Sequence, residues 1–167
     1  MFELKSLSED GVPAALAKAE RYRLLNEPHQ AESICLDVLE IEPENQQALI
    51  TLLLALTDQF GENLAAHVGP AREVLPRLHD EYNRAYYAGI ICERRAKAHL
   101  QHGGLGSRVP AYEWFQEAMA WYERAETVRP PGNDDAILRW NTCARVLNRH
   151  PELTPAPEQP TEPLMLE

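Results

Sequence analysis

The sequence predicts an all-α fold, mainly because two stretches share one spacing of small and apolar residues. In each, a small residue is followed by an apolar residue four positions on, a small or apolar residue three further, and a proline five after that. The stretches hold Ala118, Tyr122, Ala125 and Pro130, and Ala31, Cys35, Val38 and Pro43. Spacings of four and three place side chains on one face of a helix. Proline then ends the helix because it has no N–H to donate.

Two further helices are predicted in the first half of the chain. Residues 8–26 form the first, since Ser8 can cap its N-terminus and Glu9 and Asp10 suit the positive end of the helix dipole. Residues 46–60 form the other, because leucines share one face and Gly61 can adopt the positive φ that ends helices. These leucines are Leu49, Leu52, Leu53 and Leu56.

The second half is predicted to contain a helix over residues 80–101, a loop over 102–109 and a final helix over 134–149. Glycines at 103, 104 and 106 favour the loop. The segment before these elements allows two interpretations. Either a short helix around Ala71 is broken by Pro76, or one long helix begins near Pro76.

Residues 1–150 are predicted to form the helical domain and residues 151–167 an acidic, proline-rich extended tail. Prolines and glutamates dominate the tail, and this composition favours extended, polyproline-type chain because it cannot build a core. The tail ends in an apolar tip of Leu164, Met165 and Leu166. One hypothesis is that residues 161–167 occupy a groove of their own or a neighbouring subunit, giving self-association through the tail. An inert tail is the alternative.

The repeated spacing around Ala31 and Ala118 resembles the second helix of a tetratricopeptide repeat (TPR). Ala19 and Tyr22 stand where the first helix of such a unit carries its small residue and its tyrosine, although Ala15 and Lys18 replace the usual Trp and Leu. The resemblance extends over about residues 8–149. It implies a TPR-like α-solenoid of three helix pairs followed by a C-terminal solvating helix.

In TPR proteins the first helix of each pair lines a concave surface, and the resemblance implies which residues would do so here. They are Leu16, Ala17, Glu20 and Arg23 on the first helix, Ile50, Thr51, Leu54 and Asp58 on the second, and Asn83, Tyr86, Tyr87, Ile90, Glu93 and Arg94 on the third. The apolar members would form the floor of a groove. A register shift of one residue would move some of them into the core, which is the competing interpretation.

The resemblance implies a non-catalytic scaffold that binds a protein or peptide, as an adaptor or co-chaperone-like module. Some TPR proteins capture the C-terminal carboxylate of chaperone peptides with Lys and Asn. The corresponding positions here hold Leu16 and Glu20, Ile50 and Leu54, and Tyr86 and Ile90. An apolar groove is therefore favoured, with basic residues nearby for acidic residues of the partner, or else as a solvated face. These basic residues are Arg84, Arg94, Arg95 and Lys97.

No catalytic or cofactor-binding pattern is recognised, so the chain is predicted not to be an enzyme. His99 and His102 could share a face at a helix end, but no third residue stands at metal-ligand spacing, and solvated histidines are favoured. The glycines after them lack the strand and the Lys-Ser/Thr of a phosphate-binding loop. Two alternatives stay open, a homo-oligomeric structural module and a regulatory subunit with a cryptic metal site.

The net charge of −10 opposes binding to phosphate backbones and anionic membrane surfaces, because both depend on Lys and Arg. The most apolar stretch, residues 48–56, is too short to span a bilayer. Cys35, Cys92 and Cys143 are odd in number and far apart, so they are predicted to be small buried hydrophobic residues. A cytoplasmic location is expected, without a nucleic-acid or membrane partner.

Overall fold

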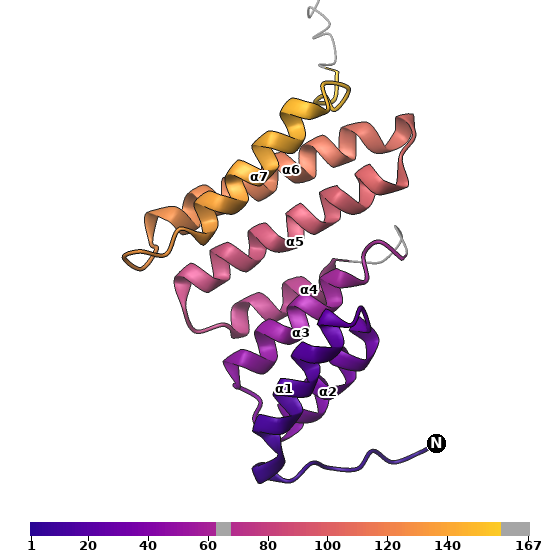
Figure 1. Ribbon diagram of the computed structural model, residues 1–167, viewed down its shortest axis with the longest axis vertical. Helices are drawn as coiled ribbons and strands as arrows, with labels where there is room; N and C mark the ends of the chain where they lie inside the picture. The colour runs from indigo at the N-terminus through magenta and orange to yellow at the C-terminus, as the bar shows by residue number, and fades with distance from the viewer. Residues whose placement is uncertain (63–67, 158–167) are drawn as a thin grey trace, which may run out of the picture.

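A computed structural model describes residues 1–62 and 68–157, and over these residues the fold is entirely helical (Figure 1). The predicted all-α class is confirmed. The helices are α1 (Val12–Leu24), α2 (Pro28–Ile41), α3 (Gln46–Asp58), α4 (Gly69–Val74), α5 (Glu81–His102), α6 (Leu105–Thr127) and α7 (Asp135–Arg149), with short 3-10 turns η1 (Glu9–Gly11) and η2 (Leu75–Arg77). Helices that are consecutive in sequence pack on each other, from α1 and α2 at one end of the molecule to α6 and α7 at the other.

The first three helices approach closely because small residues stand at their contacts. Ala19 and Ala31 have no exposed surface. Helix α1 begins at Val12, later than predicted, since residues 9–11 form η1 and the side chain of Ser8 makes no capping hydrogen bond. Helix α3 begins at the predicted position, where the side chain of Asn45 accepts a hydrogen bond of 2.9 Å from the N–H of Ala48.

The segment between α3 and α5 contains only one short helix among its described residues. Helix α4 has six residues, and Pro76 lies in the η2 turn that follows it. Leu78 is then extended, with ψ of 130°, and almost fully buried. The interpretation with one long helix from near Pro76 is therefore wrong, because the chain breaks at Leu78 and α5 starts at Glu81. Residues 63–67 of this segment lie outside the described residues.

Helices α5 and α6 form a long hairpin, and the predicted loop over residues 102–109 is wrong. Gly103 and Gly104 make the connection, with φ of 74° and 85°, and α6 starts immediately afterwards. Gly106 lies in the first turn of α6, outside the helix interior where the backbone entropy of glycine is most costly. Burial of Ser107 and Ala111 holds the segment in place. Neither of these long helices, nor any other in the described ranges, is long and apolar enough to cross a membrane.

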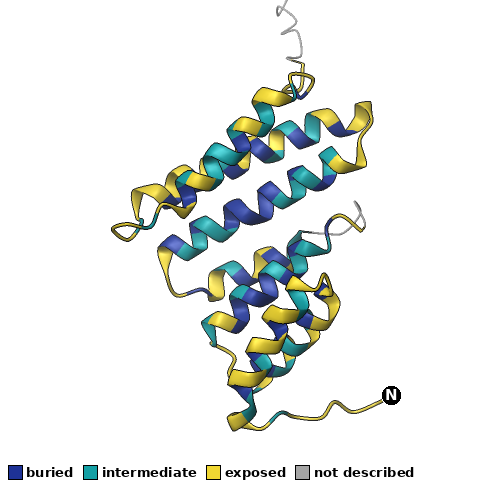
Figure 2. Cartoon of the chain, viewed as in Figure 1, coloured by how far each residue is buried: buried dark blue, intermediate teal, exposed yellow. Residues whose placement is uncertain are grey.

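Helix α5 is shared by two apolar clusters. Ile91 and Ala98 belong to the cluster with α1 to α4, whereas Tyr82 and Ala96 belong to the cluster with α6 and α7. Buried residues therefore occur along most of its length (Figure 2). Gly89 lies so close to α6 that a Cβ added there would come within 2.5 Å of a ring carbon of Tyr122.

Packing continues beyond the last helix. Ala136 and Cys143 of α7 are fully buried, in the apolar cluster that α7 shares with α6. Leu153 is also buried, and its N–H donates a hydrogen bond of 2.9 Å to the carbonyl of His150. Among the described residues, packing thus continues to Leu153, three residues beyond position 150. Residues 158–167, including the hypothesised ligand segment 161–167, lie outside the described residues.

The three cysteines are buried and unpaired, as predicted. Burial raises the pKa of the thiols of Cys35, Cys92 and Cys143 to about 12. Each thiol is therefore protonated at neutral pH, and none is in the electropositive, exposed setting that activates cysteine.

Candidate functional site

Five of the residues predicted to line a concave surface lie in one groove between α1 and α3. They are Glu20, Arg23, Ile50, Thr51 and Leu54, and Leu24 and Gln47 complete the lining. The groove has a volume of about 480 Å³. Leu24, absent from the prediction, is 88% exposed and is its most prominent apolar side chain. We call this surface the α1–α3 groove.

Three predicted residues form a chain of ion pairs from α1 through α3 to α5. The Nε of Arg23 donates to Oδ2 of Asp58 at 2.7 Å, and Arg94 donates to Oδ1 of the same carboxylate. Arg94 also donates to Oγ1 of Thr57 at 2.7 Å and to the carbonyl of Leu54 at 3.0 Å. Burial lowers the pKa of Arg94, and Asp58 opposes this effect. These three side chains lie together, and their charges are already paired with one another.

A second polar cluster is centred on Glu93, which is 1% exposed. Its carboxylate accepts hydrogen bonds from the hydroxyl of Tyr122 at 2.6 Å, from Lys97, and from Arg139 at 3.3 Å. Burial, and then the charge of Glu93, raises the pKa of Tyr122. The cluster joins α5, α6 and α7, so Glu93 holds three helices together instead of facing a groove. A glutamate directly after the buried Cys92, with Lys97 one turn on, is the sequence signal for it.

The remaining predicted groove residues lie partly in the core. Leu16 is 5% exposed and Ile90 1%, so neither contributes to a binding surface, and the prediction for both is corrected. Leu16 shares the core face of α1 with Val12 and Ala19, at spacings of four and three. Ile90 is covered because α5 packs against helices on two sides.

Tyr86 and Tyr87 are half-buried and held by other aromatic rings. Tyr86 stacks on Tyr82 with ring centroids 5.6 Å apart, and the rings of Tyr86 and Tyr87 meet edge to face at 5.1 Å. Tyr87 packs against both apolar clusters. These contacts make both tyrosines part of the support of the fold, so substitutions there would disturb more than a binding surface.

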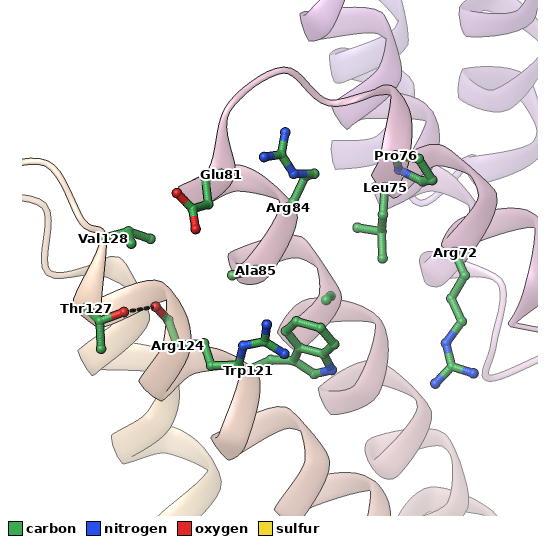
Figure 3. A pocket seen from close by; sticks show the side chains of 11 residues that line it. Arg72, Leu75, Pro76, Glu81, Arg84, Ala85, Trp121, Arg124, Thr127 and Val128 are labelled. Carbon is green, nitrogen blue, oxygen red and sulfur yellow. Dashed lines mark hydrogen bonds between the residues drawn. The ribbon is translucent and has the colours of Figure 1, made fainter.

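A larger cavity, not predicted from the sequence, opens between α4, η2, α5 and the C-terminal part of α6. Its volume is about 560 Å³, and its lining includes Arg72, Leu75, Arg84, Trp121, Arg124 and Val128. In Figure 3, residues of α4, η2 and the start of α5 face Trp121 and Arg124 of α6 across it. A neighbouring hollow of about 390 Å³ shares Arg72, Leu75 and Trp121 and extends to Glu117. We call the two together the outer cleft.

The outer cleft is present because α4 is much shorter than α6. Helix α6 has 23 residues and α4 has six, so α4 covers only part of the α6 face turned toward it. That face carries Trp114, Glu117, Trp121, Arg124 and Val128 at spacings of three and four. This stripe of tryptophan and charge is the signal in the sequence that could have indicated the cleft.

The two histidines considered as metal ligands lie near the far end of the α5–α6 hairpin. His99 lines a cavity of about 250 Å³ with His150 and Glu152, which form a contact of 2.8 Å between Nδ1 and Oε1. Burial, and then the charges of Arg95 and His102, lowers the pKa of His99. Within residues 1–62 and 68–157, no three His, Cys, Asp or Glu side chains are arranged to hold a metal ion.

Two surfaces therefore have the shape to receive another chain, the α1–α3 groove and the outer cleft. Their linings differ, because the groove is mainly apolar while the cleft combines tryptophan with three arginines. No protein-family model, curated protein or solved structure matches this chain, so its own side chains are the basis for assigning a function.

Proposed function

We propose that this chain is a TPR-like, non-catalytic scaffold that binds a segment of another protein in the α1–α3 groove, as a cytoplasmic adaptor or co-chaperone-like module. The observation that carries the proposal is the exposed Leu24 beside the half-buried Ile50 and Leu54. Exposed apolar side chains gathered at a groove are typical of surfaces that bind protein.

The packing supports a TPR-like arrangement. Ala31 and Ala118, the small residues of the repeated spacing, are fully buried, as are the apolar residues four positions after them, Cys35 and Tyr122. Helices α1 and α2, and α5 and α6, pack as pairs, and α7 covers the last face. The six-residue α4 departs from the pattern, since it is too short to be an ordinary second helix of the middle pair.

The lining of the groove indicates what kind of segment it would bind. Apolar side chains of the partner would pack on Leu24, Ile50 and Leu54. Acidic residues of the partner would lie toward Arg94 and Lys97, which are already bound to carboxylates of this chain and would have to be shared. Apolar contacts are therefore expected to supply most of the affinity.

The proposal predicts that a charge at Leu24 weakens partner binding while the same charge elsewhere does not. Peptides selected against the intact chain from a random display library would be titrated against Leu24→Asp. We expect at least a tenfold loss of affinity, roughly 1.4 kcal/mol, because an apolar contact is replaced by a charge that must stay hydrated. Isothermal titration calorimetry measures the effect.

Leu138→Asp is the matched control, since Leu138 is also an exposed leucine, 61% accessible, but lies on α7. Equal affinity of both variants and the parent chain would contradict binding in the α1–α3 groove. Self-association is the alternative function that the neighbouring exposed side chains of Leu24 and Leu25 favour. A mass above that of one chain by light scattering, reduced to one chain by Leu24→Asp, would establish it instead.

A further inference from the structure

The outer cleft differs in charge from the protein as a whole. The chain carries a net charge of −10, yet the described residues that line the cleft include Arg72, Arg84 and Arg124 against two carboxylates, Glu81 and Glu117, and Glu117 is paired with Arg72 at 3.3 Å. A basic, partly apolar hollow on an acidic protein attracts a ligand that is acidic and apolar at once. This inference is independent of the α1–α3 groove, which lies on other helices.

The arginines of the cleft are held in place with part of their hydrogen-bonding capacity still available. The guanidinium of Arg124 lies over the ring of Trp121, 4.5 Å from its centroid. Arg84 donates through one nitrogen to the carbonyls of Leu78 and His79, at 2.8 and 3.0 Å. Since a guanidinium has five N–H donors, both arginines can still bind carboxylates.

We propose that residues 158–167 of the same chain dock in the outer cleft. The segment EQPTEPLMLE contains three glutamates and no lysine or arginine. Its three consecutive apolar residues, Leu164, Met165 and Leu166, match the apolar part of the cleft formed by Leu75, Trp121 and Val128. The glutamates would pair with the arginines, and the apolar residues would cover Trp121.

The segment has the length to reach the cleft. Leu153 lines the same small cavity as Ser107, which places the start of the tail beside the first turns of α6. From Ser107 to Trp121 the helix rises roughly 21 Å at 1.5 Å per residue. From Leu153 to Leu164, eleven residues of extended chain at 3.1 Å per residue cover up to roughly 34 Å. The α1–α3 groove is a poorer site for the tail, since α1 and α3 lie toward the opposite end of the molecule from the end of α7 (Figure 1).

Methionine methyl resonances of the full-length chain test the proposal. The chain has three methionines, Met1, Met119 and Met165, so methyl-labelled methionine gives three signals, and Met165→Leu identifies the third. We expect the Met165 methyl to be displaced from its position in a free peptide of residues 158–167, because the tryptophan ring shields it. Trp121→Leu and Arg124→Glu should each return it to the peptide position.

Trp140→Leu is the matched control, because Trp140 lies on α7 outside the cleft, and it should leave the Met165 signal displaced. Arg124 is exposed, so Arg124→Glu tests the cleft without removing a core side chain. A Met165 signal at the peptide position in the parent chain would overturn the proposal. So would a displacement that disappears on tenfold dilution, because the tail would then be docking on a neighbouring copy.

Discussion

Replacing Glu93 with alanine is expected to lower the free energy of unfolding by about 3 kcal/mol, toward the lower end of the cost of breaking a buried ion pair. The carboxylate is 1% exposed and holds Tyr122, Lys97 and Arg139 together. Without it, the buried hydroxyl of Tyr122 loses its acceptor and a cavity is left. Lys97 and Arg139 are 37% and 38% exposed, so they can turn toward water, which limits the loss.

Urea unfolding followed by circular dichroism measures this effect, and two further variants show where it comes from. Glu113→Ala, at an exposed position of α6, should change stability by less than about 0.5 kcal/mol. Tyr122→Phe removes only the hydroxyl and should cost about 1–2 kcal/mol. If Glu93→Ala is no less stable than Glu113→Ala, the Glu93 cluster does not join the three helices as described.

Replacing Gly89 with alanine is expected to destabilise the fold by about 1–3 kcal/mol, although alanine is the better helix former. The added Cβ would lie 2.5 Å from one ring carbon of Tyr122 and 2.7 Å from another. The ring cannot move away freely, because its hydroxyl is bound to Glu93 and its surroundings are fully packed. Either α5 and α6 separate slightly or the hydrogen bond to Glu93 lengthens.

Gly106→Ala provides the comparison, since it is also a helical glycine and a Cβ there meets nothing within 4 Å. It should be neutral or raise stability by up to about 1 kcal/mol. Combining Gly89→Ala with Tyr122→Leu should cost less than the sum of the two single changes, because leucine removes the clash. Strict additivity in this cycle would show that the contact between Gly89 and the ring is not the cause.

The spacing of four and three predicted much of the helical core, because burial along a helix depends on its 3.6-residue period. Ala31, Cys35, Ala118 and Tyr122 are buried for that reason. Leu16 was assigned to the groove by the TPR resemblance and not by this spacing, although it stands four residues after Val12 and three before Ala19 on the core face of α1. The prediction that Ile90 lines a groove was wrong because α5 packs against other helices on two sides, which leaves little of its surface exposed.

The outer cleft could not be predicted because it depends on the length of one helix. The position of α4 and the break at Leu78 come from a segment in which Pro76 allowed two interpretations. The stripe on α6 was visible in the sequence, but whether a neighbouring helix covers it is decided by α4. The start of α6 was missed because glycine lowers helix propensity, while the packing of Ser107 and Ala111 outweighs that preference.

Because the three thiols are buried, their alkylation can report when the helices around them separate. Cys35 lies in the cluster of α1 to α4, and Cys92 and Cys143 lie in the cluster of α6 and α7. A thiol with a pKa of about 12 inside a packed core reacts with iodoacetamide only after the surrounding helices separate. Alkylation followed by mass spectrometry would therefore time the opening of each end of the molecule separately, and we expect Cys35 and Cys143 to be modified at different rates.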